Sequence, residues 1–192
     1  CPVGDLRAAL YDKFYGDTRD IEYGLFPWYL RSFKTESRTP FPEGMVLIVS
    51  DRLYSFDVRS VGRFFYIVSE AFLSLCKQLN VDVVDSVEIQ VLSKAGECRA
   101  KKKYHAVLFK EFNVRKDTHP ATDLMVEDGV PFGIRKLVLP SDWNRDLFKY
   151  GRLVSGSNSL ICSERFKELG KGFKGVNYMP LDGLVWSGVR RI

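Results

Sequence analysis

Residues 65–92 read FYIVSEAFLSLCKQLNVDVVDSVEIQVL, and their pattern predicts two strands around a helix. The β-branched run predicts a strand over 62–68. Ser69 is a favourable N-cap, and Glu70 suits the positive start of a helix. The helix is expected to reach about residue 79, with one apolar face formed by Phe72, Leu75, Cys76 and Leu79. Alternation then predicts a second strand over 82–92, with Val87, Ile89 and Val91 on one face.

A similar pattern recurs near the end of the chain. Residues 159–169 echo residues 65–75 as strand, Ser-Glu cap and amphipathic helix. We expect a strand over 160–162 and a helix over 163–169, ended by Gly170 and Gly172. Strand-to-helix junctions commonly reuse this capping chemistry, and two copies do not make a solenoid.

The other elements are shorter. Further strands are expected over 45–49, 104–112, 131–139 and 176–179, and a short helix over 5–15. The strands 82–92 and 104–112 should form an antiparallel pair joined by a long basic loop. Because there is no regular βαβ series, the pattern predicts an α+β fold with a mainly antiparallel sheet and a few short helices.

Length and composition fit a single domain. The 192 residues are 45% hydrophobic, which suits one core. We expect one domain over 1–192, with an irregular N-terminal region at 1–44 and an α+β core at 45–192. No apolar run approaches the roughly 20 residues that span a bilayer, and the residues given contain no signal peptide. A membrane partner is therefore not expected.

The cysteines do not form a recognisable motif. Cys1, Cys76, Cys98 and Cys162 are widely spaced, and the chain has two histidines. These spacings do not supply the clustered ligands of a zinc site. A reducing cytoplasm with Cys76 and Cys162 as small buried hydrophobes is the simpler expectation. Cys1 at the start suits either a trimmed chain, the simpler case, or a processed envelope protein.

Charge is distributed unevenly. Residues 1–100 hold 12 Lys and Arg against 14 Asp and Glu, whereas residues 101–192 hold 17 against 10. The basic second half is compatible with a nucleic acid, an acidic protein partner or an ordinary solvated surface.

Catalytic motifs are missing from the sequence. It contains no G-x-S-x-G, no G-x-x-x-x-G-K and no H-E-x-x-H. The glycine-rich run 170–175 ends a helix, whereas a phosphate loop must begin one. His119 is expected in a surface loop, His105 in a structural role, and the run 127–129 in a turn. We therefore expect no catalytic residue, no metal and no cofactor.

Two clusters are candidate partner-binding residues. Lys101, Lys102, Lys103 and Tyr104 form the densest basic run and suit either phosphate contact with base stacking or a charged hairpin tip. Trp28, Tyr29 and Arg31 have the residue types that anchor protein interfaces, or they pack beneath the proline-rich loop.

Several segments, in this order and spacing, resemble one family. They are 66–75 with its Ser-Glu helix start, the strands 87–91 and 103–112, then Asp-Leu-Phe-Lys at 146–149, the Ser-Glu-Arg helix at 161–169 and Gly-Val-Asn-Tyr-Met-Pro-Leu at 175–181. This order resembles the immunity proteins of bacterial polymorphic toxin systems, in the branch first catalogued as a domain of unknown function. Cys162 departs from the valine of that pattern, and the N-terminal region has no counterpart.

The resemblance implies a function as well as a fold. It implies a bacterial, cytoplasmic protein that neutralises a cognate toxin or effector domain by tight non-covalent binding, without catalytic residues. A toxin that met residues 101–192 would then present an acidic or neutral face. The alternative is a nucleic-acid-binding module that uses the basic C-terminal half.

Overall fold

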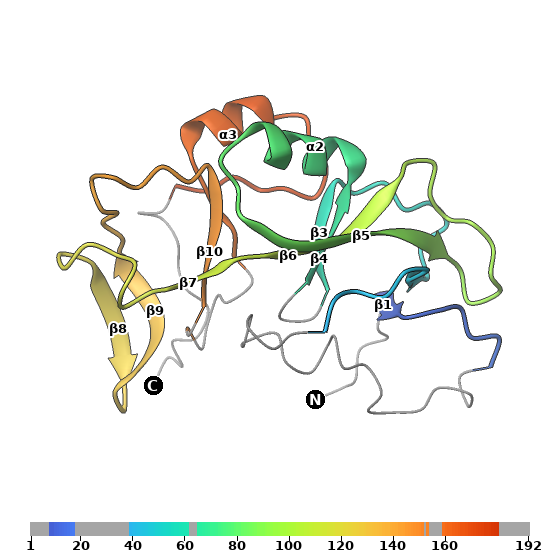
Figure 1. Cartoon of the computed structure of the whole chain (residues 1–192), viewed down its shortest axis with the longest axis horizontal. Coiled ribbons are helices and arrows are strands. Elements are labelled where there is room, and N and C mark those ends of the chain that lie inside the picture. The colour runs from blue at the N-terminus through green and yellow to red at the C-terminus, as the bar shows by residue number, and fades with distance from the viewer. Residues whose placement is uncertain (1–7, 18–38, 62–64, 152, 154–158, 181–192) are drawn as a thin grey trace. The chain divides into compact units, whose positions relative to one another are not determined.

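The computed structural model describes residues 8–17, 39–61, 65–151, 153 and 159–180 (Figure 1). They group into two compact units. Unit 1 comprises Cys1–Leu75, Val83–Leu108 and Phe173–Gly175, and unit 2 comprises Cys76–Asp82, Phe109–Gly172 and Val176–Ile192. Each unit thus takes a short segment from the part of the chain that mainly builds the other.

Unit 1 is organised around a six-stranded sheet. Its strands are β1 (Ala8–Tyr11), β2 (Val46–Val49), β3 (Val58–Val61), β4 (Phe65–Ser69), β5 (Val83–Leu92) and β6 (Tyr104–Phe109), and its helix is the start of α2 (Glu70–Gln78). The strand order is β1-β2-β5-β6-β4-β3. The β2–β5 pair is parallel, whereas β1–β2, β3–β4 and β4–β6 are antiparallel.

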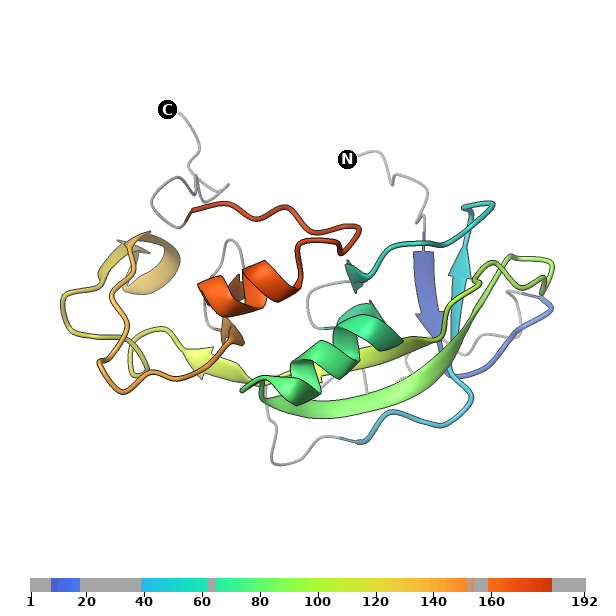
Figure 2. The ribbon, with the colours of Figure 1, turned by 90° about the horizontal axis from the view of Figure 1, so that it is seen from above.

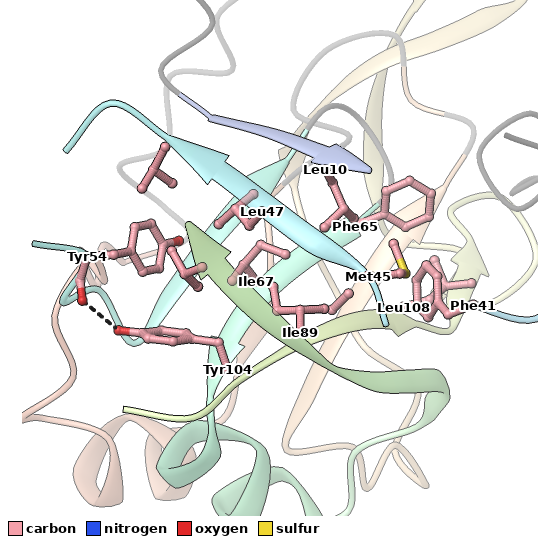
Figure 3. Packing of buried hydrophobic residues seen from close by; sticks show 13 residues of the cluster. Leu10, Phe41, Met45, Leu47, Tyr54, Phe65, Ile67, Ile89, Tyr104 and Leu108 are labelled. Atoms are coloured by element: carbon pink, nitrogen blue, oxygen red, sulfur yellow. Dashed lines mark hydrogen bonds between the residues drawn. The ribbon is translucent and has the colours of Figure 1, made fainter. Parts of the chain in front are cut away.

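Alternation along the strands separates two apolar layers. The residues on one face form a cluster that includes Leu10, Met45, Leu47, Ile67, Ile89, Tyr104 and Leu108 (Figure 3). On the opposite face α2 lies along the sheet (Figure 2) and buries Phe72 and Leu73. On β5, the alternate residues Val84, Ser86, Glu88 and Gln90 stay exposed.

Unit 2 contains smaller sheets. Its elements are β7 (Glu111–Asn113), β8 (Asp123–Glu127), β9 (Val130–Lys136), β10 (Leu147–Gly151), β11 (Ile161–Cys162) and α3 (Glu164–Leu169). β10 pairs with β11 antiparallel and with β7 parallel, and β8–β9 is an antiparallel hairpin. Phe148, Tyr150 and Ile161 form its core with Val114 and Ile134.

The predicted fold class is confirmed, because the chain has an α+β composition with mainly antiparallel pairing. The predicted helices after Ser69 and Ser163 are present, and so are the strands near 45–49, 62–68, 82–92, 131–139 and 160–162. The predicted turn at 127–129 joins β8 and β9, with positive φ at Asp128 and Gly129. The extent of a single domain over 1–192, with its division at residue 44, stays a prediction.

Three local predictions were wrong. The expected helix over 5–15 is a strand at Ala8–Tyr11, because pairing with β2 and burial of Leu10 outweigh the local apolar spacing. Residues 176–179 are not a strand, and Tyr178 instead donates a hydrogen bond from its hydroxyl to the carbonyl of Gly170. The expected strand over 104–112 is interrupted at Lys110, so that β6 and β7 join different sheets.

The similarity between residues 65–75 and 159–169 includes the hydrogen bonds of their two capping serines. In unit 1 the Ser69 hydroxyl donates to Asp57 Oδ1 at 2.7 Å, and the Ser69 amide donates to the Asp57 carbonyl at 2.9 Å. In unit 2 the Ser163 hydroxyl donates to Asp146 Oδ1 at 2.7 Å, and its amide donates to the Asp146 carbonyl at 2.9 Å. In both units an aspartate before the hairpin thus fixes the serine that caps the following helix.

A second partner of each aspartate completes this parallel. The amide of Asp57 donates to the Lys174 carbonyl, and the amide of Lys174 returns a hydrogen bond to Asp57 Oδ2 at 2.9 Å. The amide of Asp146 donates to the Asn80 carbonyl, and the amide of Asn80 returns one to Asp146 Oδ2 at 3.1 Å. Asn80 follows α2 and Lys174 follows α3, so each helix is followed by the segment that completes the other unit.

Replacing Ser163 with alanine is expected to lower the free energy of unfolding by about 1–2 kcal/mol. The Ser163 hydroxyl accepts from the Phe166 amide at 3.1 Å and donates to Asp146, so both bonds are lost. Urea denaturation measures the change. Ser163→Thr keeps the hydroxyl and should retain most of the stability, whereas equal stability of the alanine variant and the wild type would contradict this role.

Candidate functional site

The predicted partner-binding residues fall in different settings. Trp28, Tyr29 and Arg31 lie outside the described residues. Lys101, Lys102 and Lys103 are exposed at the end of the loop that joins β5 to β6. This loop, residues 93–103, extends from the end of β5 beyond the sheet (Figure 1). We refer to it as the basic loop.

The first half of the basic loop is a tight turn. Its first residue, Ser93, is buried and accepts hydrogen bonds at its hydroxyl from the amides of Ala95 and Glu97, both at 3.2 Å. The Ser93 amide donates to the Glu97 carbonyl at 2.8 Å, and the Gly96 amide donates to the Ser93 carbonyl at 3.0 Å. Gly96 has φ of +80°, which favours glycine.

The second half is attached to the sheet through its backbone. The amide of Arg99 donates to the Val91 carbonyl at 2.8 Å, and its carbonyl accepts from the Tyr54 amide at 2.7 Å. Isolated bridges join Leu92 to Cys98 and Tyr54 to Ala100. The loop is therefore held in place over much of its length, which reduces the entropy lost when a partner binds.

Three of its cations have carboxylate partners. Lys102 Nζ lies 2.7 Å from Asp57 Oδ1, Lys103 Nζ lies 3.7 Å from Glu88 Oε2, and Arg99 Nη2 lies 2.5 Å from Glu97 Oε2. The Lys103 and Arg99 pairs are partly exposed and contribute little to stability. Their main effect is to direct the side chains.

Asp57 is the buried anchor for Lys102. Its side chain is 6% exposed and accepts hydrogen bonds from Lys102, from the Lys174 amide and from the Ser69 hydroxyl. Burial raises the pKa of Asp57, but these donors together outweigh burial and hold the pKa below its usual range. Asp57 is therefore ionised at neutral pH and fixes Lys102, while Lys101 and Lys103 on either side remain exposed.

Tyr104 is part of the core. It is 1% exposed, its hydroxyl donates to the Tyr54 carbonyl at 3.3 Å, and its ring centroid lies 4.9 Å from that of Tyr54 (Figure 3). Burial, assisted by the charge of Asp57, raises the pKa of Tyr104 to about 12. Its ring is therefore not accessible to a base or to a partner protein, and Tyr104 is not part of the candidate surface.

A shallow groove of about 260 Å³ runs along β5 beside the basic loop. Apolar groups make up most of its surface, and the charged side chains of Glu88, Lys102 and Lys103 also line it. The lining includes Glu88, Gln90, Leu92, Cys98, Lys102 and Lys103. Such a shallow, open depression suits contact with a macromolecular surface better than enclosure of a small molecule.

The histidines occupy the predicted settings. His105 lies on β6 with Nε2 2.5 Å from Glu70 Oε2, which ties β6 to the first residue of α2. His119 is exposed in a loop, where its Nδ1 accepts from the Ala121 amide at 3.1 Å. Within the described ranges, no group of three His, Cys, Asp or Glu side chains is placed to hold a metal ion.

The described cysteines differ in environment. Cys76 is buried on α2, and burial raises the pKa of its thiol to about 12, as expected of a small hydrophobe. Cys162 is half-buried, and burial together with the charge of Glu164 raises its thiol pKa. Cys98 is exposed at the groove.

Neither helix in the described part of the chain has the length and apolar character needed to cross a membrane.

The structure thus defines a mixed α+β protein whose candidate site is a pre-formed charged surface. Residues 12–185 match the family model described as immunity protein 43. The match covers nearly the whole chain, and the chain belongs to this family. Comparison with curated proteins gives no match. The resemblance noted from the sequence is therefore confirmed at the level of an immunity protein family.

Proposed function

We propose that this chain protects a bacterial cell by binding a cognate toxin tightly and non-covalently in the cytoplasm. The observation that carries the proposal is the family match over residues 12–185. Protection then results from covering or distorting the toxin's active site, and this chain supplies no chemical step. The interface is expected to bury about 1,200–2,000 Å² in total, as specific protein complexes do.

The structure supports this function over the nucleic-acid alternative at one point. The predicted base-stacking residue beside the lysines, Tyr104, is buried in the core. Stacking on exposed aromatic rings supplies much of the affinity of single-strand binding proteins. Without Tyr104 the run Lys101 to Lys103 contributes no stacking ring of its own, and the exposed aromatic ring at this loop is that of Phe14, from another part of the chain.

Co-expression with the toxin encoded by the neighbouring gene is expected to restore growth, and the two proteins should co-purify at a fixed stoichiometry. Colony counts measure protection, and size-exclusion chromatography measures the complex. An unrelated α+β protein of similar size, expressed from the same plasmid, is the control. Absence of both rescue and co-purification with every neighbouring gene product would contradict the proposal.

A further inference from the structure

An exposed aromatic residue lies at the tip of the basic loop. Phe14, shortly after β1, is 38% exposed. A Cβ placed on Gly96 would lie 3.1 Å from Cζ of the Phe14 ring, so the ring rests on the glycine backbone. Because Gly96 has no side chain, the ring can approach the loop closely and remain accessible on its outer side.

The same surface carries excess positive charge. The loop sequence SKAGECRAKKK has five basic residues and one acidic residue. Lys94 and Lys101 are exposed and have no ion pair among the residues that the structure describes. Lys103 is exposed and pairs with Glu88 at 3.7 Å, a distance that leaves its ammonium able to take another partner.

We propose that Phe14, the basic loop and the exposed face of β5 form one docking surface for an acidic segment of the partner toxin. This proposal rests on the proposed function. Carboxylates of the segment pair with Lys94, Lys101 and Lys103, and an apolar side chain covers the ring of Phe14. The loop is already fixed by its own hydrogen bonds, so little ordering is needed on binding.

The sign pattern favours an acidic protein over a phosphate backbone. Glu88 and Glu97 project among the lysines, and their side chains are 59% and 65% exposed. A continuous polyanion that crossed this surface would meet both carboxylates at a cost. A folded protein can instead place separate acidic groups opposite the lysines and donors opposite the glutamates.

The test uses the purified full chain and the toxin of the neighbouring gene. Lys94→Glu/Lys101→Glu reverses two lysines without touching the Asp57 pair, which reversal of Lys102 would break. The matched control, Lys116→Glu/Lys136→Glu, makes the same charge change at exposed residues of unit 2. Circular dichroism and thermal unfolding show whether each variant keeps the fold.

We expect the Lys94/Lys101 variant to associate with the toxin at least about tenfold more slowly than the wild type or the control at low salt. The difference should shrink in about 0.5 M salt, where exposed charges are screened. Phe14→Ala should instead accelerate dissociation, because it removes an apolar anchor.

Each other outcome has a distinct meaning. The docking surface would be overturned if the folded Lys94/Lys101 and Phe14→Ala variants associated and dissociated at wild-type rates. The proposed function would stand in that case, provided that the wild type still binds the toxin and protects. A wild-type chain that neither binds nor protects would overturn the function itself. Binding of the wild type to a single-stranded oligonucleotide at physiological salt, lost in the Lys94/Lys101 variant, would overturn the acidic protein as occupant.

Discussion

Replacing Asp57 with alanine is expected to lower the free energy of unfolding by about 3 kcal/mol, as seen when a buried charged hydrogen-bonding group is removed. The change removes the acceptor of the Ser69 hydroxyl, the Lys174 amide and the Lys102 ammonium. Two of these donors belong to buried or partly buried groups that would lose their partner. Urea or guanidinium denaturation at neutral pH measures the loss.

The stability contributed by Asp57 should also depend on pH. Its pKa is held below the usual value in the folded chain, so the unfolded chain binds the proton more readily. This contribution is therefore complete above about pH 4, the unfolded pKa, and is lost as the pH falls through the folded pKa. The free energy of unfolding of Asp57→Asn, which cannot ionise, should depend less on pH below about pH 4. If the stability of Asp57→Asn fell with decreasing pH as steeply as that of the wild type, Asp57 would not be the source of this pH dependence.

Replacing Glu111 with alanine is expected to lower the free energy of unfolding by a similar amount, about 3 kcal/mol, because it removes the carboxylate of an ion pair whose lysine is buried. Lys149 on β10 is 1% exposed, and its Nζ lies 2.8 Å from Glu111 Oε1 on the neighbouring β7. Gly151 makes room for this carboxylate, since a Cβ there would lie 2.6 Å from Glu111 Oε2. Chemical denaturation again measures the loss.

Two variants separate the charge from the packing. Glu111→Leu/Lys149→Met removes both charges and should unfold within about 1 kcal/mol of the wild type, because apolar pairs often replace buried ion pairs at little cost. Glu111→Gln keeps an oxygen near the ammonium and should fall between the alanine variant and the wild type. If the double variant proved as unstable as Glu111→Ala, packing rather than charge would explain the loss.

The sequence predicted the features that depend on nearby residues. Ser69 and Ser163 cap helices through bonds to amides three residues ahead, so a short window contains all the information. The alternation in residues 82–92 likewise indicates which face of β5 is buried, and Ile89 and Val91 are buried as predicted.

Features that depend on distant residues could not be predicted in this way. Asp57 bonds to Lys174, 117 residues later, and no local pattern indicates that pair. The strand β1 forms because it pairs with β2, and the apolar spacing of 5–15 gives no indication of that pairing.

For Tyr104 the alternation along residues 104–112 indicates burial. It shares its face of β6 with Ala106 and Leu108, and all three are buried. Phe14 falls within the helix expected over 5–15, and its place beside Gly96 depends on the fold.

The exchanged segments after the two helices affect any attempt to divide this protein. A fragment that ends at Leu108 would contain Asp57 without Lys174, and a fragment that begins at Phe109 would contain Asp146 without Asn80. In each fragment the backbone amide of the aspartate would also lose the carbonyl to which it donates in the intact chain. Truncation at this boundary therefore removes a structural part of both pieces, and binding studies with halves of the chain would test damaged proteins rather than separate modules.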